Sequence, residues 1–311
     1  MLSPIKKIAV IGIGVIGVGW TLRLLAKNKE VYVFDPNIKQ KKFLFDEIKR
    51  TTKLLKKFYK ISTVSTKKLH FTKTIKEAVK NVDLVQENTP ENEKIKKNTV
   101  KEISKWTKPN VIIASSSSGL LPSRIQTSCI NPERFIIAHP FNPVYLLPLV
   151  EIVKGRKTKH NFIKKSEIFY RSIGMQPLII KKEVEGYLSD RLQESMWRES
   201  LHIINENLAS TDDLDKAIVH GPGLRWSLMG TFLTFHLAGG KQGMKHMLNQ
   251  FGPTLKLPWT KLKAPKLTRK LKNRIIKGTK NQCKSKSIKE LTTIRDNFLI
   301  DLLKIKNKYK I

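Results

Sequence analysis

Three segments of the chain carry side chains that could move a proton. They are the serine run 115–118, the segment His139-Pro140-Phe141-Asn142-Pro143, and Glu151 within the apolar run 149–153. An imidazole titrates near neutral pH and can act as a general base. A carboxylate inside an apolar strand is costly unless it is paired. We therefore predict that Glu151 accepts the ring N–H of His139, and that His139 takes the proton of a substrate alcohol.

The residues alone leave a structural interpretation of the same segments open. A histidine at the end of a strand is often a satisfied core residue, and serine-rich turns are common. The serines follow the predicted strand Val111–Ala114, and His139 ends the predicted strand Phe135–Ala138. Open α/β sheets bind ligands at the carboxyl ends of their strands, so this placement favours a functional site.

A glycine motif near the N-terminus is typical of dinucleotide binding. It follows the predicted strand Ile8–Ile11 and opens a helix. Gly12 permits a tight turn, Gly14 lets a pyrophosphate approach the backbone, and Gly17 lets helix and strand pack closely. The helix N-terminus then offers free N–H groups to the phosphates. The residues that we expect to bind the cofactor here are Gly12, Ile13, Gly14, Val15, Ile16 and Gly17.

Asp35 stands immediately after the second predicted strand, Val31–Phe34. A carboxylate at this position accepts hydrogen bonds from the ribose hydroxyls and repels a 2′-phosphate. We therefore expect the cofactor to be NAD rather than NADP.

The elements that must position these residues alternate between strands and helices in the first half of the chain. Further strands are predicted at Asp83–Gln86, Leu149–Val153 and Pro177–Ile180, and helices at Ile38–Phe58 and around Glu91–Ile103. This alternation predicts an α/β fold with a Rossmann-type doubly wound parallel sheet. The sheet would form an NAD-binding domain over residues 1–182.

Residues 183–311 are predicted to form a smaller all-helical domain for substrate binding and dimerisation. Apolar residues recur at helical spacing from Tyr187 to Ala209, which predicts one long helix. Residues 211–213 (Thr-Asp-Asp) resemble a cap for the next helix. Ser287 and Glu290 form a candidate capping box for the last helix.

The composition narrows the class of protein further. No apolar run is long enough for a membrane span, no signal-peptide pattern is evident, and Cys129 and Cys283 lie in no metal motif. We therefore expect a cytoplasmic protein without a metal site. The net charge of +35 is spread along the chain without a stripe of stacking aromatics, so we expect no specific nucleic-acid partner.

These motifs, in this order, resemble the 3-hydroxyacyl-CoA dehydrogenase family over nearly the whole chain. The resemblance implies catalytic roles for Ser118, His139, Asn142 and Glu151. It places Glu91, with Glu87, near the nicotinamide side of the cofactor. It also implies a homodimer formed through the helical half.

The chain departs from the family pattern at Asp190, where the family has asparagine. A carboxylate there disfavours an acyl-CoA thioester, because it adds repulsion near a developing enolate-like oxygen. Segments 117–123, 139–151, 190–194, 221–226, 229–240 and 251–259 instead resemble a subgroup that oxidises L-carnitine. The resemblance therefore implies oxidation of the 3-hydroxyl of L-carnitine to 3-dehydrocarnitine.

Carnitine has a carboxylate at one end and a quaternary ammonium at the other. Aromatic faces and carboxylates hold such an ammonium, and a guanidinium holds the carboxylate. We expect Asp190, Arg191, Arg225 and Trp226 to bind the substrate. Further candidates are Phe141, Tyr145, Trp197, Arg198, Phe232 and Phe235, although an aromatic residue taken singly is more often part of the core than of a binding site.

Two other functions stay open at this point. A short-chain 3-hydroxyacyl-CoA dehydrogenase, or a dehydrogenase of another 3-hydroxy acid, would use the same His–Glu pair. A non-catalytic cofactor-binding or nucleic-acid-binding protein could share the scaffold, but the joint presence of Ser118, His139 and Glu151 disfavours it.

Overall fold

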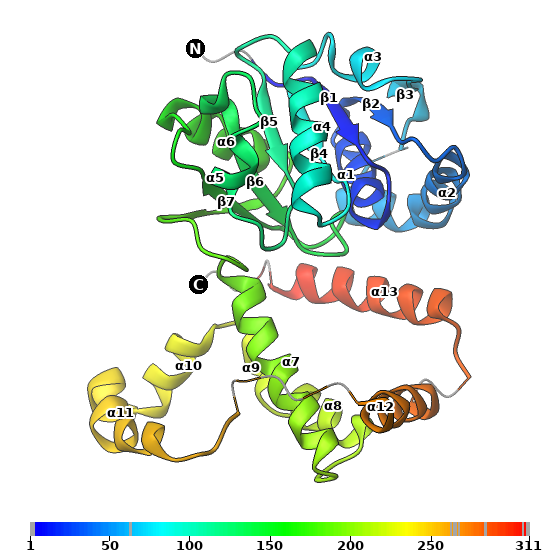
Figure 1. Cartoon of the computed structure of the whole chain (residues 1–311). Coiled ribbons are helices and arrows are strands. Elements are labelled where there is room, and N and C mark those ends of the chain that lie inside the picture. The colour runs from blue at the N-terminus through cyan, green and yellow to red at the C-terminus, as the bar shows by residue number, and fades with distance from the viewer. Residues whose placement is uncertain are drawn as a thin grey trace. The chain divides into compact units, whose positions relative to one another are not determined.

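The computed structural model describes residues 4–61, 64–261, 263, 266, 268–282, 285–306 and 308. The chain divides into two compact units, Met1–Asp190 and Arg191–Ile311 (Figure 1). The division falls later than the predicted boundary at 182/183, because unit 1 holds the intervening loop. Gly186 N donates to Gly119 O (3.4 Å), and the Tyr187 hydroxyl donates to Leu120 O (2.8 Å).

Unit 1 contains an eight-stranded sheet in the order β3-β2-β1-β4-β5-β6-β7-β8. The strands are β1 (Lys7–Ile11), β2 (Glu30–Phe34), β3 (Leu69–Phe71), β4 (Leu84–Glu87), β5 (Ile112–Ser115), β6 (Phe135–Pro140), β7 (Leu149–Lys154) and β8 (Gln176–Ile180). The Rossmann-type fold class and the predicted strands are confirmed. The sequence analysis missed β3, because three residues are too short to show a periodic pattern.

The sheet is mostly parallel rather than parallel throughout, so the prediction of a parallel sheet was wrong for one pair of strands. Strands β1 to β6 run parallel, whereas β7 pairs antiparallel with β6 and β8 runs parallel to β7. Only residues 141–148 connect β6 to β7, and a parallel crossover needs about a dozen residues or more. The short connection therefore reverses the chain and pairs His139 directly with Glu151.

Helices cover the sheet of unit 1, and α4 crosses one face of it in Figure 1. They are α1 (Val15–Ala26), α2 (Lys39–Tyr59), α3 (Ile75–Val79), α4 (Glu93–Trp106), α5 (Pro122–Gln126) and α6 (His160–Ser172), with 3₁₀ turns η1 (Thr66–Lys68) and η2 (Pro132–Arg134). Consecutive residues of β1, Ile8 to Ile11, are all buried. Burial on both faces is typical of a doubly wound sheet.

Arg23 of α1 fixes the connection between β6 and β7. Its side chain is 1% exposed and donates to the carbonyl oxygens of Val144 (2.7 Å) and Leu147 (2.9 Å). It also donates to the carbonyls of Ile173 and Gly174, both at 3.2 Å. A buried guanidinium is stable when its N–H groups are satisfied in this way. The segment that follows His139 is therefore anchored to the glycine-motif helix.

Unit 2 is helical in every described element, as predicted. Its helices are α7 (Ser189–Asn205), α8 (Thr211–Val219), α9 (Pro222–Trp226), α10 (Thr231–Ala238), α11 (Gly243–Phe251), α12 (Arg269–Gln282) and α13 (Ile288–Lys306), with η3 (Gly240–Gln242) and η4 (Gly252–Lys256). The predicted helix from Tyr187 begins later, at Ser189, because Tyr187 has a positive φ of 48°.

Of the two helix caps predicted in unit 2, one is shifted by one residue and the other is confirmed. The cap of α8 is Ser210 rather than Thr211: Asp213 N donates to the Ser210 hydroxyl (3.1 Å), and Ser210 N donates to the Asp213 carboxylate (3.3 Å). A residue in extended conformation presents its side chain to the first turn, which Thr211 inside the helix cannot do. The capping box of Ser287 and Glu290 is confirmed, with Glu290 N donating to the serine hydroxyl at 3.2 Å.

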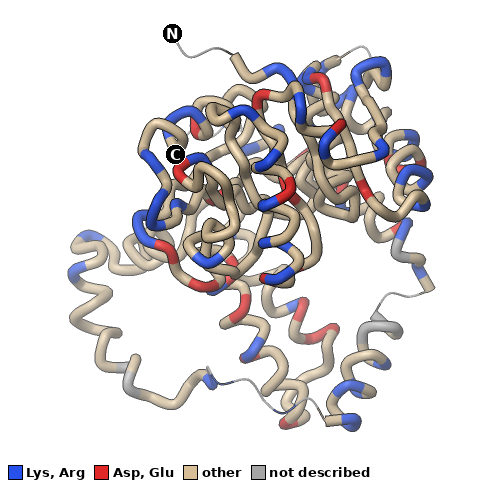
Figure 2. The backbone as a smooth tube through the Cα atoms, turned by 45° about the horizontal axis from the view of Figure 1, so that its top comes forward, with Lys and Arg blue, Asp and Glu red and all other residues tan. Residues whose placement is uncertain are grey.

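The basic residues and the cysteines lie as follows in the described residues. Lys and Arg are distributed over both units (Figure 2). Cys129 is buried, and burial raises the pKa of its thiol to about 11. Cys283 lies outside the described residues. Among the helices described, none is long and apolar enough to cross a membrane.

Candidate active site

His139 and Glu151 form a buried hydrogen-bonded pair in the sheet. The antiparallel register of β6 and β7 places the two residues opposite each other, and His139 Nδ1 lies 2.9 Å from Glu151 Oε2. The side chains are 7% and 0% exposed. An ionised Glu151 accepts the Nδ1 proton, which leaves Nε2 as the atom of His139 that can exchange a proton with a ligand.

The second oxygen of Glu151 anchors the start of α7. Oε1 accepts hydrogen bonds from the backbone N–H groups of Leu188 (3.1 Å) and Ser189 (3.0 Å). Burial raises the pKa of Glu151, but the hydrogen bonds from His139, Ser189 and Leu188 outweigh that effect. The net pKa therefore lies below the ordinary value of 4.5, and Glu151 is ionised at neutral pH.

Asp190 brings a second carboxylate to His139. Its Oδ2 lies 3.6 Å from His139 Nε2, a distance for an ion pair rather than a hydrogen bond. The rings of Phe141 and Tyr187 flank the imidazole, with centroids 5.3 and 5.6 Å from that of His139. The structure thus brings together the predicted residues His139, Glu151, Phe141 and Asp190 within unit 1.

The serine run forms a turn that is organised around Glu91. Glu91 Oε1 accepts hydrogen bonds from the Ser117 hydroxyl (2.5 Å) and from the backbone N–H groups of Ser118 (3.0 Å) and Gly119 (3.1 Å). Glu91 is therefore a support of this turn, in addition to its predicted position beside the cofactor. Ser118 is left exposed at the carboxyl edge of the sheet, and so is Asn142.

Sequence reasoning missed a buried ion pair next to this turn. Lys96 Nζ lies 3.2 Å from Oε1 of Glu87, and both side chains are at most 1% exposed. Glu87 also accepts hydrogen bonds from the hydroxyls of Ser115 and Thr89. The helical spacing of the sequence could have revealed this pair. Lys96 lies on the same face of the predicted helix as the apolar residues Val100 and Ile103, where a charge needs a partner. The pair joins α4 to the end of β4, and the Ser115 hydroxyl joins Glu87 to the end of β5.

The glycine turn fits a dinucleotide. Gly12 has a φ of +85°, and a Cβ on Gly17 would lie 1.9 Å from Gly12 O, so both positions require glycine. A Cβ on Gly14 would meet no protein atom within 4 Å. Gly14 is also the N-cap residue of α1, and no side chain caps this helix. The first N–H groups of α1 are thus available to a pyrophosphate.

Asp35 lies beside the glycine turn, as predicted from its position after β2. Its Oδ2 accepts a hydrogen bond from Ile13 N (2.9 Å), and its Oδ1 accepts one from Asn37 N (2.8 Å). Each carboxylate oxygen can accept a further hydrogen bond, so the ribose hydroxyls can still bind.

The other predicted ligand residues are not among those that contact His139 within unit 1. Tyr145 is buried, and its hydroxyl accepts a hydrogen bond from Arg50 Nη2 (2.8 Å), so its ring packs inside unit 1. Arg191, Arg225 and Trp226 belong to unit 2. Trp197, Arg198, Phe232 and Phe235 belong to the same unit. Their substrate contacts stay predictions.

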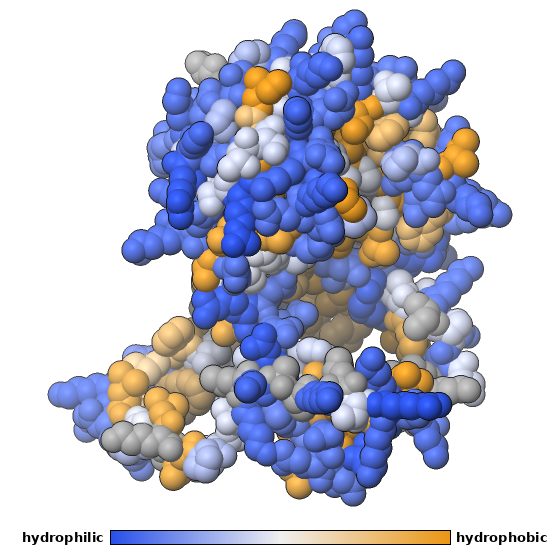
Figure 3. Space-filling model, in the orientation of Figure 1, coloured by the Kyte–Doolittle hydropathy of each residue, from blue (hydrophilic) through white to orange (hydrophobic). Residues whose placement is uncertain are grey.

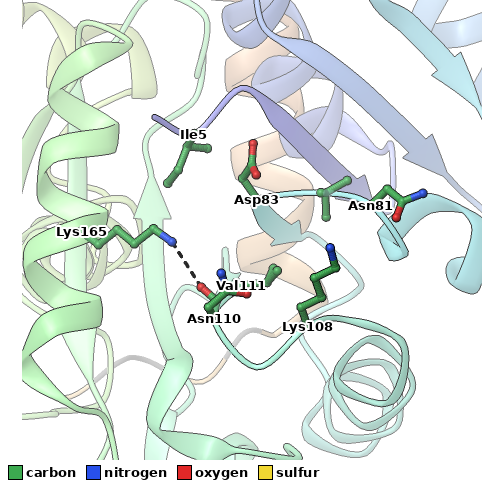
Figure 4. A pocket seen from close by; sticks show the side chains of 8 residues that line it. Ile5, Asn81, Asp83, Lys108, Asn110, Val111 and Lys165 are labelled. Atoms are coloured by element: carbon green, nitrogen blue, oxygen red, sulfur yellow. Dashed lines mark hydrogen bonds between the residues drawn. The ribbon is translucent and has the colours of Figure 1, made fainter. Parts of the chain in front are cut away.

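A small cavity lies at the opposite edge of the sheet (Figure 4). Its lining residues Ile5, Asp83 and Val111 precede β1, β4 and β5, so the cavity is at the amino ends of these strands. Asp83 Oδ2 accepts hydrogen bonds from the backbone N–H groups of Lys6 and Lys7, so this carboxylate has a structural role. The cavity is therefore separate from the glycine turn. No cluster of metal-binding side chains occurs in the described part of the chain.

The fold and the site define an NAD-dependent dehydrogenase. The chain belongs to the 3-hydroxyacyl-CoA dehydrogenase family: the NAD-binding domain of that family matches residues 7–184, and its C-terminal domain matches residues 186–278. The cofactor is accordingly NAD, and the reaction is oxidation of a 3-hydroxyl group on a small-molecule substrate.

Two curated relatives are similar over nearly their full length. An L-carnitine dehydrogenase of Bacillus cereus is 50% identical over 307 residues, which cover 99% of this chain and 94% of the relative. An L-carnitine dehydrogenase of Oceanobacillus iheyensis is 47% identical, with 98% of this chain and 99% of the relative covered.

Solved structures support the fold. A 5-formyl-3-hydroxy-2-methylpyridine 4-carboxylic acid 5-dehydrogenase superposes with a TM-score of 0.80 at 23% identity, covering 98% of this chain and 100% of that one. A 3-hydroxyacyl-CoA dehydrogenase from Archaeoglobus fulgidus superposes with a TM-score of 0.64 at 25% identity, covering 96% and 98%.

The lowered pKa of Glu151 predicts a pH-dependent contribution to stability. Because the folded pKa lies below the unfolded one, the ionised carboxylate stabilises the fold above the ordinary value of 4.5. This stabilisation is lost as the pH falls through the folded pKa. In Glu151→Gln we expect a lower free energy of unfolding at about pH 7 and a smaller further loss towards about pH 3 than in the unaltered protein.

Urea denaturation at several pH values measures this. Glu194→Gln is the control, because Glu194 is an exposed carboxylate on α7 that pairs with Arg198. A Glu151→Gln variant whose stability falls with acid as steeply as that of the unaltered protein would contradict the prediction.

Proposed function

We propose that this enzyme oxidises the 3-hydroxyl of L-carnitine to 3-dehydrocarnitine with NAD. The observation that carries the proposal is the Asp190 carboxylate at 3.6 Å from His139 Nε2. This charge suits a substrate with a cationic group near its alcohol. The names of relatives that are 44–50% identical over nearly the whole chain support the same substrate.

In the proposed reaction, Nε2 of His139 takes the hydroxyl proton of the substrate. Bound NAD supplies the acceptor for the hydride that leaves the same carbon. Glu151 holds the Nδ1 proton and stabilises the imidazolium that forms. This arrangement requires the ring to keep one orientation, which the 2.9 Å hydrogen bond to Glu151 enforces.

Polar and aromatic groups at the carboxyl edge are proposed to orient the substrate. Ser118 and Asn142 would hydrogen-bond the substrate oxygen. Asp190 and the ring of Phe141 would face the trimethylammonium group, because quaternary ammonium ions bind carboxylates and aromatic faces. Arg191 and Arg225 are proposed to bind the carboxylate, and Trp226 the ammonium.

We also propose that the enzyme is a homodimer formed through unit 2. Its helices expose large apolar side chains, among them Leu192 (68%), Trp197 (53%) and Phe232 (83%). Figure 3 shows hydrophobic residues at the surface of unit 2. Exposed apolar surface of this kind is typical of subunit interfaces.

Light scattering of the purified chain tests the dimer. We expect a mass of twice the 35.7 kDa of one chain. A single-chain mass at micromolar concentration would contradict the dimer without affecting the proposed reaction.

An assay of NAD reduction with two substrates, and with a substitution of the proposed base His139, tests the reaction. NAD reduction should be rapid with L-carnitine and slow with 3-hydroxybutyryl-CoA. In His139→Ala we expect kcat to fall at least about 100-fold with little change in NAD affinity, because only the proton acceptor is lost. The control is His160→Ala, which alters an exposed histidine at the start of α6.

Turnover near the normal rate in His139→Ala would remove the assignment of the base. Faster reduction of NAD with 3-hydroxybutyryl-CoA than with L-carnitine would favour the acyl-CoA alternative instead.

A cofactor-preference assay tests the role of Asp35. In Asp35→Ser we expect the preference for NAD over NADP to fall about tenfold or more, because the charge that repels the 2′-phosphate is gone. The ratio of kcat/KM values for the two cofactors measures this, and Asp46→Ser, an exposed position on α2, is the control. An unchanged ratio would refute the role.

A further inference from the structure

The imidazole of His139 lies between two carboxylates of unit 1. Glu151 of β7 is 2.9 Å from Nδ1, and Asp190 of α7 is 3.6 Å from Nε2. Glu151 is fully buried, whereas the Asp190 side chain is 28% exposed and so can be reached by a ligand. The two acids therefore face different surroundings, although both contact the same ring.

The two contacts make different demands on the protons of the ring. A neutral imidazole carries one N–H, and the Nδ1 proton serves the hydrogen bond to Glu151. The lone pair of a neutral Nε2 would then face the negative Oδ2 of Asp190, which is repulsive. The contact with Asp190 is attractive only when Nε2 also carries a proton. A protonated Nε2 cannot accept the proton of an alcohol.

The other close neighbours of His139 do not change this charge balance. Phe141 and Tyr187 contact the ring from the segment after β6 and from the loop before α7. Burial raises the pKa of Tyr187, so its hydroxyl stays neutral. Among the ion pairs of His139 in the described residues, both partners are carboxylates.

We propose that Asp190 makes the base responsive to the charge of the substrate. In the free enzyme, Asp190 holds His139 in its protonated form. A substrate cation that pairs with Asp190 replaces the imidazolium as its partner, and the Nε2 proton then leaves to solvent. The net charge of the cluster is unchanged, because the arriving ammonium compensates for the proton that departs. Nε2 is then free to accept the hydroxyl proton.

This role distinguishes substrates by turnover as well as by binding. A substrate of the same shape without the cationic group leaves Asp190 paired with the imidazolium, so most of its bound complexes lack a free base. Asp190 is thus a specificity-determining residue rather than only a contact for the ammonium. The inference rests on the proposed function, since it needs a substrate with a cation close to its alcohol.

The test compares L-carnitine with its carbon isostere 3-hydroxy-5,5-dimethylhexanoate, which keeps the shape and the carboxylate but has no cationic group. In the unaltered enzyme, kcat should be at least about tenfold higher with L-carnitine. In Asp190→Asn, which keeps the shape and removes the charge, kcat with the isostere should rise and the ratio of the two kcat values should fall towards one. Glu194→Gln, a carboxylate on the same helix that pairs with Arg198, should keep the original ratio.

The outcomes distinguish failure of the inference from failure of the proposed function. Turnover of L-carnitine with a kcat ratio that Asp190→Asn leaves unchanged, or a change in KM alone, would overturn the inference and leave the proposed function standing. No turnover of L-carnitine by the unaltered enzyme would overturn both.

A second measurement uses the unaltered enzyme, so it does not depend on the folding of a variant. In the unaltered enzyme labelled with ¹⁵N-histidine, the ring nitrogens of His139 should give the signature of an imidazolium. L-carnitine without NAD should convert this signature to that of a neutral ring, and the isostere should not. A neutral ring in the free enzyme, or the same response to both ligands, would overturn the inference.

Discussion

The rest of the site depends on the hydrogen bonds that the buried carboxylate of Glu151 accepts. One of its oxygens accepts the ring proton of His139, and the other accepts the backbone N–H groups of Leu188 and Ser189. A single buried charge thus connects β6, β7 and the start of α7. Because loss of any of these donors would leave the buried charge less fully hydrogen-bonded away from water, the arrangement resists distortion. The orientation of the His139 ring and the position of Asp190 follow from it.

A second set of buried acids supports the neighbouring strand ends. Glu87 pairs with Lys96 and accepts the hydroxyl of Ser115, while Glu91 holds the turn of Ser117 and Ser118. These contacts lie where β4 and β5 end, on the same edge of the sheet as the glycine turn. The acids of this edge therefore have distinct structural roles: Glu87 and Glu91 fix the backbone, and Glu151 orients the ring of His139.

Oxidation of a 3-hydroxyl group is common to the family, and in our proposal the charge beside His139 distinguishes the substrate. The His–Glu pair suits oxidation of any 3-hydroxyl group, so it does not select between a thioester and a zwitterion. Asp190 adds a negative charge beside Nε2, the atom that exchanges the proton in the proposed reaction. Substrate charge can thereby act on the protonation of the base as well as on binding.

The sequence by itself determined the glycine turn, Asp35, the strands that carry the serines and His139, and the helical character of unit 2. These features depend on local spacing and on apolar periodicity, which the chain displays directly. Only the tertiary structure decided that β7 turns back on β6, and this reversal sets Glu151 opposite His139. It also decided that Lys96 is buried against Glu87, that Arg23 satisfies four backbone carbonyls, and that Asp190 reaches Nε2. Contacts of this kind join residues far apart in the chain, so they depend on packing rather than on any local pattern.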